Sequence, residues 1–237
     1  MKSPEPLLAF GAHPDDLEFG CGGLIAHETR AGRPVHLVVC SRGEAGTNGP
    51  PARRTAEAKR AAKILGATIE FIRLDGDAHL ELKPAHALRL AGIIRRVKPG
   101  IVLAPTLEQN QHPDHYRLGQ LVRDASRLAR YGGLRELKRL PVHAIGQLLF
   151  YAISPDAEPA GVQPVLVALS PATIKTWIEA MEAHASQLRT RNYPALQLAR
   201  ASVNGSRCGA LAAIALWPND PPVFASLVPL TRAARRF

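Results

Sequence analysis

Cysteine is scarce in this sequence, and its cysteines stand far apart. Only three are present, Cys21, Cys40 and Cys208, and no two of them have the Cys-x-x-Cys spacing. An odd and scattered set excludes a disulfide framework and a zinc site built from thiolates. We therefore expect a protein of the reducing cytoplasm.

Aromatic residues and long apolar runs are also few. Phe, Trp and Tyr make up 5% of the chain, which is little for a surface that binds single-stranded nucleic acid by stacking its bases. The N-terminus has a Pro-Glu-Pro interruption before only four apolar residues, so it predicts no signal peptide. No window approaches the apolar length of a membrane span. We expect neither nucleic acid nor a membrane as a partner.

Positive charge, in contrast, is abundant. The sequence has 30 Lys and Arg against 20 Asp and Glu, a formal net charge of +10. Such a balance favours an anionic partner, which can be nucleic acid, a membrane surface or an acidic small molecule. The sign of the charge does not choose among these classes.

Short apolar runs alternate with stretches of helical periodicity in the first two thirds of the chain. With 237 residues, 46% hydrophobic and 21% charged, the sequence is typical of a globular protein. The alternation predicts an α/β fold, with a Rossmann-like, mostly parallel sheet and helices on both faces. The expected strands are 7–10, 35–40, 68–72, 101–104 and 147–153, and the expected helices are 16–32, 52–65, 84–97 and 117–131.

The order weakens after Ser154. We expect a loop over 155–164, a strand over 165–169, and a helix that begins at Pro171 with Ser170 as N-cap and runs to about residue 191. A short apolar segment follows at 210–216. We interpret the chain as one domain, 1–237, with its core at about 5–153 and a smaller, irregular α/β part at about 154–237.

The tripeptide His-Pro-Asp occurs twice, in the tetrads His13-Pro14-Asp15-Asp16 and His112-Pro113-Asp114-His115. Chance predicts about 0.03 copies in a chain of this composition. Each tetrad closely follows a predicted parallel strand, and ligand sites of open α/β sheets form beyond the carboxyl ends of the strands. A single tetrad is often only a loop with a helix cap, but the pair at two strand ends predicts a site.

Imidazole and carboxylate groups together suit zinc or a similar divalent ion, and a catalytic site keeps one coordination position open. His13 and Asp16 offer two ligands from one turn, and His112 and His115 are candidates for the third. If every residue of a tetrad were a ligand, the metal would be closed to substrate. Asp15 and His112 are therefore the obvious groups for acid-base chemistry.

Several further motifs accompany the tetrads. They are Gly20-Cys21-Gly22-Gly23, Arg42-Gly43-Glu44-Ala45-Gly46-Thr47, Arg54-Thr55-Ala56-Glu57, Pro99 to Pro105, and Met181 to Gln187. With these motifs, the chain resembles the LmbE-like, or PIG-L, family of zinc-dependent N-acetylglucosamine deacetylases over about residues 7–187. The segment from Arg42 to Thr47 and the length are most similar to the bacillithiol-biosynthesis branch, which deacetylates GlcNAc-malate.

The resemblance implies a role for each matching residue. His13, Asp16 and His115 would hold the zinc, and Asp15 would be the general base. His112 would stabilise the oxyanion or protonate the leaving amine, and Asp114 would orient it. Arg54 matches a family position in the active site and would hold a substrate hydroxyl or acid group.

One family feature is missing near the C-terminus. Relatives of the bacillithiol branch commonly have a Tyr-Ala-Glu-x-Phe segment there, whereas this chain has Ala213 to Pro218 with no acid. We expect this region to line or cap the acceptor side of the pocket, so the aglycone of the substrate stays open.

Three other features have a simpler interpretation. The glycines at 20, 22 and 23 are not followed by the Gly-Lys-Ser/Thr sequence that ends a phosphate-binding loop. They therefore predict close packing of a helix against the sheet. The basic row Arg123, Arg127, Arg130, Arg135, Lys138 and Arg139 is typical of a solvated surface, with an anion-binding face as the alternative. His184 suits helix-end packing and a place near the pocket equally well.

The sequence thus predicts a cytoplasmic zinc hydrolase that removes acetyl from an N-acetylglucosaminyl conjugate, with GlcNAc-malate as the leading candidate and Fe²⁺ as an alternative metal. Mycothiol-type and chitooligosaccharide-type substrates are the nearest alternatives. A basic metal-dependent nucleic-acid-binding protein and a family member that binds sugar without turnover are more distant ones. The resemblance also implies a homo-oligomer.

Overall fold

The computed structural model describes residues 4–230 and 233–234 of the chain. A seven-stranded sheet runs through the molecule in the order β3-β2-β1-β4-β5-β7-β6. The first five strands of that order are parallel, and β7 is antiparallel to both β5 and β6. The strands are β1 (Leu7–Gly11), β2 (Val35–Val39), β3 (Thr68–Phe71), β4 (Ile101–Pro105), β5 (Gln147–Tyr151), β6 (Val165–Leu169) and β7 (Ala212–Pro218). The mostly parallel α/β sheet expected from the sequence is confirmed.

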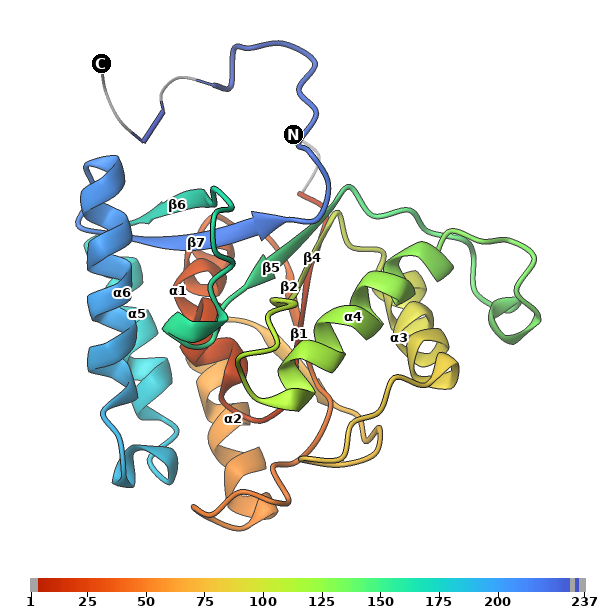
Figure 1. The fold of residues 1–237 in the computed structure, drawn as a ribbon, viewed down its shortest axis with the longest axis horizontal. Coiled ribbons are helices and arrows are strands. Elements are labelled where there is room, and N and C mark those ends of the chain that lie inside the picture. Colours follow the sequence, from red (N-terminus) through yellow and green to blue (C-terminus); the bar gives the residue numbers. More distant parts are fainter. Residues whose placement is uncertain (1–3, 231–232, 235–237) are drawn as a thin grey trace.

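Helices cover both faces of this sheet (Figure 1). One face carries α1 (Asp16–Arg30), α2 (Pro51–Leu65), α5 (Pro171–Glu182) and α6 (Tyr193–Cys208). The other face carries α3 (Pro84–Val97) and α4 (Pro113–Leu128). No helix in the described part of the chain is long and apolar enough to cross a membrane.

Two hydrophobic cores lie on the two sides of the sheet. In β1, Leu7 and Ala9 belong to the core under α1, α2 and α5, whereas Leu8 and Phe10 belong to the core under α3 and α4. Because successive side chains of a strand point to opposite faces, a strand buried on both faces must be apolar throughout. This explains why the strand runs in the sequence are continuous and do not alternate with polar residues.

The glycines of α1 allow this helix to pack closely, as the sequence predicts. A Cβ atom at Gly22 would lie 2.7 Å from Cδ1 of Trp177, and one at Gly23 would lie 2.7 Å from Cδ1 of Leu169. Trp177 is buried and donates its indole N–H to the carbonyl of Glu18 at 2.7 Å. The ring therefore has little freedom to move away from α1.

We expect Gly22→Ala to destabilise the protein by about 1–3 kcal/mol, because the added methyl overpacks a fixed indole ring. Gly92→Ala is the matched control, since a Cβ at this helical glycine would meet its nearest side-chain atom at 3.6 Å. There the substitution should be neutral or stabilising because alanine favours the helix. Urea unfolding of both variants measures the difference, and equal stabilities would contradict the packing argument.

The C-terminal part differs most from the sequence prediction. The helix expected to reach residue 191 ends at Glu182, and a second helix, α6, begins at Tyr193. The reason is a long-range contact: Glu57 of α2 accepts hydrogen bonds from the N–H of Ser186 at 3.0 Å and from its hydroxyl at 2.5 Å. This contact holds the chain in a turn where the local pattern favours a helix.

The region from Ala213 to Pro218 is also placed differently from our expectation. It forms most of β7, which pairs with β5 and β6 inside the sheet. Its residues are mostly buried and do not line the cavity described below. The expectation that this region lines or caps the acceptor side of the pocket is wrong for the described structure, because the segment is held in the sheet by strand pairing.

Candidate metal centre and active site

The two His-Pro-Asp tetrads meet at the carboxyl edge of the sheet, between β1 and β4. These strands are neighbours, and β2 lies beyond β1 while β5 lies beyond β4, so the strand order reverses direction here. Such a switch point is where open α/β sheets bind ligands. The first tetrad follows β1 and leads into α1, and the second leads into α4.

Helix α4 begins at Pro113, earlier than the expected residue 117. Proline is favoured at the first helical position, and the side chain of His112 caps the helix by accepting the N–H of Asp114 at 3.2 Å. As a result, Asp114 and His115 lie in the first turn of α4 and face the loop after β1.

His13, Asp16 and His115 bring three ligand atoms together. Nδ1 of His13 lies 3.2 Å from Nε2 of His115, which lies 3.0 Å from Oδ1 of Asp16. The other carboxylate oxygen of Asp16, Oδ2, lies 3.5 Å from Nδ1 of His13. Ligands of a tetrahedral zinc ion stand about 3.3 Å apart when the bonds are near 2.0 Å. The donor types and their spacing therefore fit a divalent metal of this kind.

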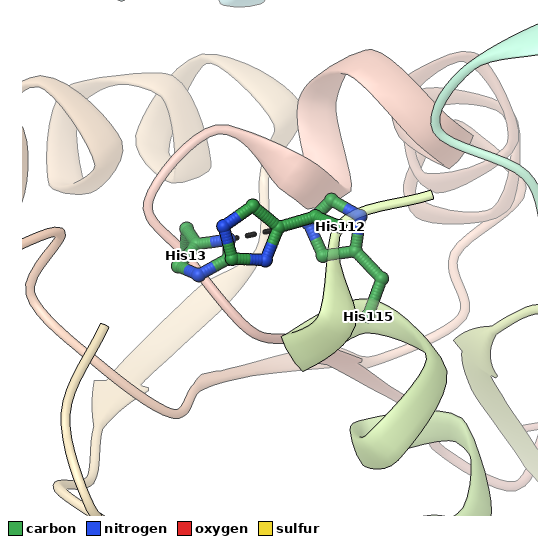
Figure 2. A group of neighbouring side chains, drawn as sticks. All are labelled: His13, His112 and His115. Carbon is green, nitrogen blue, oxygen red and sulfur yellow. Dashed lines mark hydrogen bonds between the residues drawn. The ribbon is translucent and has the colours of Figure 1, made fainter. Parts of the chain in front are cut away.

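A second set of three ligands overlaps the first. Donor atoms of His13, His112 and His115 all lie within 4.8 Å of one another, and Figure 2 shows the three imidazoles gathered between the loop after β1 and the start of α4. The His112 ring stands edge-on to His13, with the ring centroids 4.6 Å apart. His13 and His115 are common to both sets, so Asp16 and His112 are the alternatives for the third ligand.

Two carboxylates contact the other nitrogen of His13. Nε2 of His13 lies 3.0 Å from Oδ1 of Asp77 and 3.2 Å from Oδ2 of Asp114. Histidines that bind metals usually donate their second ring N–H to a carboxylate, which fixes the tautomer. A proton held on Nε2 by these acids leaves the lone pair of Nδ1 directed toward Asp16 and His115. The group of His13, Asp77 and Asp114 is therefore best explained as support for His13.

From the sequence we expected the Asp114 carboxylate to orient His112. In the structure this carboxylate has other partners. The carboxylate contacts His13 and accepts the N–H of Ala78 at 2.7 Å. Only the backbone N–H of Asp114 reaches His112. The difference arises because the side chain leaves the first turn of α4 toward the loop after β3, whereas the N–H points back to the N-cap residue.

Asp15 stands beside the ligand group with an unusual backbone. Its φ of 114° is in the left-handed region, which is strained for a residue other than glycine and is often found at functional sites. Its Oδ2 atom pairs with Nη2 of Arg54 at 3.2 Å. Burial and the charge of Asp16 raise the pKa of Asp15 to about 6, against the opposing effect of Arg54. A carboxyl group in this range can exchange protons near neutral pH.

Neighbouring charges also influence the protonation of Asp16 and His112. Burial alone would raise the pKa of Asp16, but the neighbouring His115 and His13 hold it well below its usual value. Burial, together with His13 and His115, lowers the pKa of His112. At neutral pH, Asp16 is thus a carboxylate and His112 a neutral imidazole.

Arg54 is enclosed by the protein. Besides Asp15, it donates to the carbonyls of Pro14 at 3.1 Å and Gly43 at 3.2 Å, and it lies 3.7 Å from Asp77. Any side chain at Gly43 or at Gly46 would collide with the guanidinium. The glycines of the segment after β2 are therefore needed for close packing against Arg54.

These residues surround a cavity of about 340 Å³. Every site residue expected from the sequence contributes to its wall except Asp114, which supports His13 from behind. A cleft of about 460 Å³ between α3 and α4 is larger, but it contains no histidine and only one carboxylate. The wall of the smaller cavity consists of His13, Asp15, Asp16, Phe19, Ala45, Gly46, Thr47, Arg54, Asp77, Ala78, His112, His115, Ile153, Gln187 and Tyr193.

Asp77 belongs to none of the motifs in the sequence, although its Oδ1 lies 3.0 Å from Nε2 of His13. The available signal was its position, because Asp77 follows β3, another parallel strand whose carboxyl end lies at the same edge of the sheet. His184, in contrast, is fully buried, lies 3.3 Å from Glu18 and does not line the cavity. Its ring lies 5.9 Å from the ring of Phe19, a residue of the cavity wall, so helix-end packing and a place near the pocket both agree with the structure.

The sequence and the structure of this chain are similar to those of known proteins. The GlcNAc-PI de-N-acetylase (PIG-L) family matches residues 8–126, half of the chain. The conserved protein TT1542 from Thermus thermophilus has a similar structure, with a TM-score of 0.81 and 30% identity over 97% of this chain and 100% of that one.

Three relatives with a curated name include one hydratase and two deacetylases. The 4-oxalmesaconate hydratase of Pseudomonas putida is 30% identical over 168 residues, 65% of this chain and 63% of the hydratase. The diacetylchitobiose deacetylase of Thermococcus kodakarensis is 33% identical over 161 residues, 61% and 59% of the two chains. The probable N-acetyl-alpha-D-glucosaminyl L-malate deacetylase 2 of Bacillus subtilis is 32% identical over 130 residues, 50% and 59%.

The matched region thus spans about three fifths of the length of these curated relatives. The family match nevertheless includes β1 to β4 and both His-Pro-Asp tetrads, which are the elements that build the candidate site. On this match, and with the seven-stranded fold it shares with TT1542, the chain belongs to the PIG-L, or LmbE-like, family.

Proposed function

We propose that this chain is a zinc-dependent N-deacetylase that hydrolyses the acetamide of an N-acetylglucosaminyl conjugate. The observation that carries the proposal is the meeting of His13, Asp16 and His115 in the wall of a cavity, with the Asp15 carboxylate beside them. Family membership supports the same reaction class. The scarcity of cysteines supports a cytoplasmic location, and the resemblance supports a homo-oligomer.

In this proposal His13, Asp16 and His115 hold the metal. When bound, Zn²⁺ lowers the pKa of a water ligand to about 7 and polarises the acetamide carbonyl. Asp16 is better suited than His112 to complete the set, because Asp16 is buried and its second oxygen is anchored by the N–H groups of Ala12 and His13 at 2.8 Å. His112 is exposed and stays available for the substrate. Fe²⁺ is the alternative occupant of the same two-histidine, one-carboxylate set.

Asp15 is the proposed general base. Its carboxylate lines the cavity and is held from behind by Arg54, so it can take the proton of the attacking water. His112 lies beside the rings of His13 and His115, with centroids 4.6 and 5.2 Å away, and would stabilise the developing oxyanion or pass a proton to the leaving amine.

Asp114 and Arg54 have supporting roles in this proposal. Asp114 keeps His13 in the tautomer that a metal requires. Arg54 orients Asp15, and its place in the cavity wall allows contact with a substrate hydroxyl or acid group.

GlcNAc-malate remains the leading substrate. It is supported by the resemblance of the segment from Arg42 to Thr47 and by the similarity to the probable N-acetyl-alpha-D-glucosaminyl L-malate deacetylase 2 of Bacillus subtilis. Inositol and chitobiose conjugates are the alternatives, the latter on the similarity to the Thermococcus enzyme.

The test is a panel of N-acetylglucosamine conjugates of malate, inositol, a second N-acetylglucosamine and methanol, with release of free amine as the readout. We expect amine release from the panel and the highest kcat/KM with the malate conjugate. If the metal-loaded protein releases amine from none of them, the proposed substrate class is wrong.

Hydration of a small unsaturated acid is a second candidate, because 4-oxalmesaconate hydratase is 30% identical over 168 residues. The match to the GlcNAc-PI de-N-acetylase family over residues 8–126 favours the deacetylase over this candidate. Loss of the ultraviolet absorbance of 4-oxalmesaconate, without amine release in the panel, would favour the hydratase.

A further inference from the structure

The cavity wall contains little positive charge that a substrate can use. Among its residues, Arg54 is the only Lys or Arg. Its guanidinium is buried and already lies near two carboxylates, Asp15 at 3.2 Å and Asp77 at 3.7 Å. An anionic group on the aglycone therefore requires a second cation, which must come from the rim of the cavity.

Three arginines of the basic row lie too far away for this purpose. Arg123, Arg127 and Arg130 line a cleft together with Gln147, the first residue of β5. The first residues of parallel strands lie at the amino edge of the sheet, opposite the edge that holds the candidate site. The net charge of the protein therefore says little about the charge at the mouth of the cavity.

The turn between α5 and α6 brings another arginine next to the cavity wall. Gln187 and Tyr193 both line the cavity, and Arg191 lies between them in the sequence with its side chain exposed. Gln187 donates to the carbonyl of Asn48 at 2.6 Å, which fastens this turn to the loop after β2. The turn and the site are thus held together by contacts on both sides of Arg191.

Arg191 is held over an aromatic ring at the cavity wall. Its guanidinium carbon lies 5.7 Å from the ring centroid of Tyr193, within the range of a cation–π contact. Tyr193 in turn stacks on Phe19, with centroids 4.8 Å apart and an angle of 20° between the rings. Among the described residues, Arg191 has no carboxylate within ion-pair distance, in contrast to Arg53, which pairs with Glu57 at 3.0 Å.

We infer that Arg191, held on the ring of Tyr193 at the cavity mouth, binds an anionic group on the aglycone and thereby determines specificity for acidic N-acetylglucosamine conjugates. The inference rests on the proposed function, because it concerns the part of the substrate that projects from the site of hydrolysis. Arg191 contacts no reacting atom, so its contribution is to substrate binding.

The size of the effect follows from the exposure of Arg191. An exposed ion pair contributes modestly and is screened by salt. We expect Arg191→Gln to lower the ratio of kcat/KM for GlcNAc-malate to kcat/KM for methyl N-acetylglucosaminide by about three- to tenfold. The loss should appear as a higher KM for the malate conjugate, shrink as salt is raised to about 0.5 M, and be partly restored in Arg191→Lys.

The matched control is Arg189→Gln, which removes the same charge from an exposed position in the same turn. A binding measurement separates recognition from turnover: titration of GlcNAc-malate into Asp15→Asn should show a Kd about three- to tenfold higher when Arg191→Gln is added. An unchanged substrate ratio in Arg191→Gln, or an equal fall in Arg189→Gln, would overturn the assignment to Arg191.

The role of Arg191 and the deacetylase function can be tested separately. If the parent protein hydrolyses the methyl glycoside but shows no preference that depends on Arg191, only this inference is wrong and the deacetylase proposal stands. If the parent releases amine from neither substrate and binds neither, both are overturned.

Discussion

Asp15→Asn is expected to lower kcat for deacetylation by a factor of about 10³ while the protein keeps its metal. The amide has nearly the shape of the carboxylate and can still accept the hydrogen bond from Arg54, which lies 3.2 Å from Oδ2 of Asp15. It cannot take up a proton from the attacking water. The loss corresponds to about 4 kcal/mol of transition-state stabilisation.

Two measurements decide this prediction. Amine release gives kcat, and the metal content of the purified variant shows whether the ligand group is intact. Asp124→Asn is a suitable control because Asp124 is an exposed carboxylate of α4 that does not line the site cavity. A variant Asp15→Asn that retains more than about a tenth of the parent rate would remove Asp15 from the role of base.

His115→Ala is expected to abolish stable metal binding, with a Kd for Zn²⁺ raised by at least about 100-fold. Nε2 of His115 lies 3.0 Å from Asp16 and 3.2 Å from His13, so its removal leaves only two of the three closest donors. Metal content after dialysis, measured with a competing chelator, gives the affinity. Circular dichroism of the variant verifies that the fold is retained.

The same measurement separates the two overlapping ligand sets. If Asp16 completes the site, Asp16→Ala loses the metal, whereas His112→Ala keeps it and loses turnover. The opposite pattern would show that the three histidines hold the ion. Full retention of metal in both His13→Ala and His115→Ala would contradict each ligand set.

Local pattern along the chain was enough to predict the five parallel strands and the meeting of the two tetrads, but not β7, whose residues were recognised only as a short apolar segment. Continuous apolar runs predicted the parallel strands because a strand that is buried on both faces carries apolar side chains on both. The position of each His-Pro-Asp tetrad after such a strand predicted that they meet, since parallel strands place their carboxyl ends at one edge. The glycines of α1 predicted close packing of this helix against the sheet, which the contact of Gly23 with Leu169 of β6 confirms, whereas Gly22 packs against Trp177 of α5.

Contacts between residues far apart in the chain could be known only from the folded structure. The fold directs the Asp114 carboxylate to His13, surrounds Arg54 with Asp15 and Asp77, and places Arg191 over Tyr193, which lines the cavity. It also ends a helix at Glu182, because Glu57 holds the following turn through Ser186. Periodicity and propensity describe neighbours along the chain, whereas hydrogen bonds across more than a hundred residues depend on how the folded elements pack.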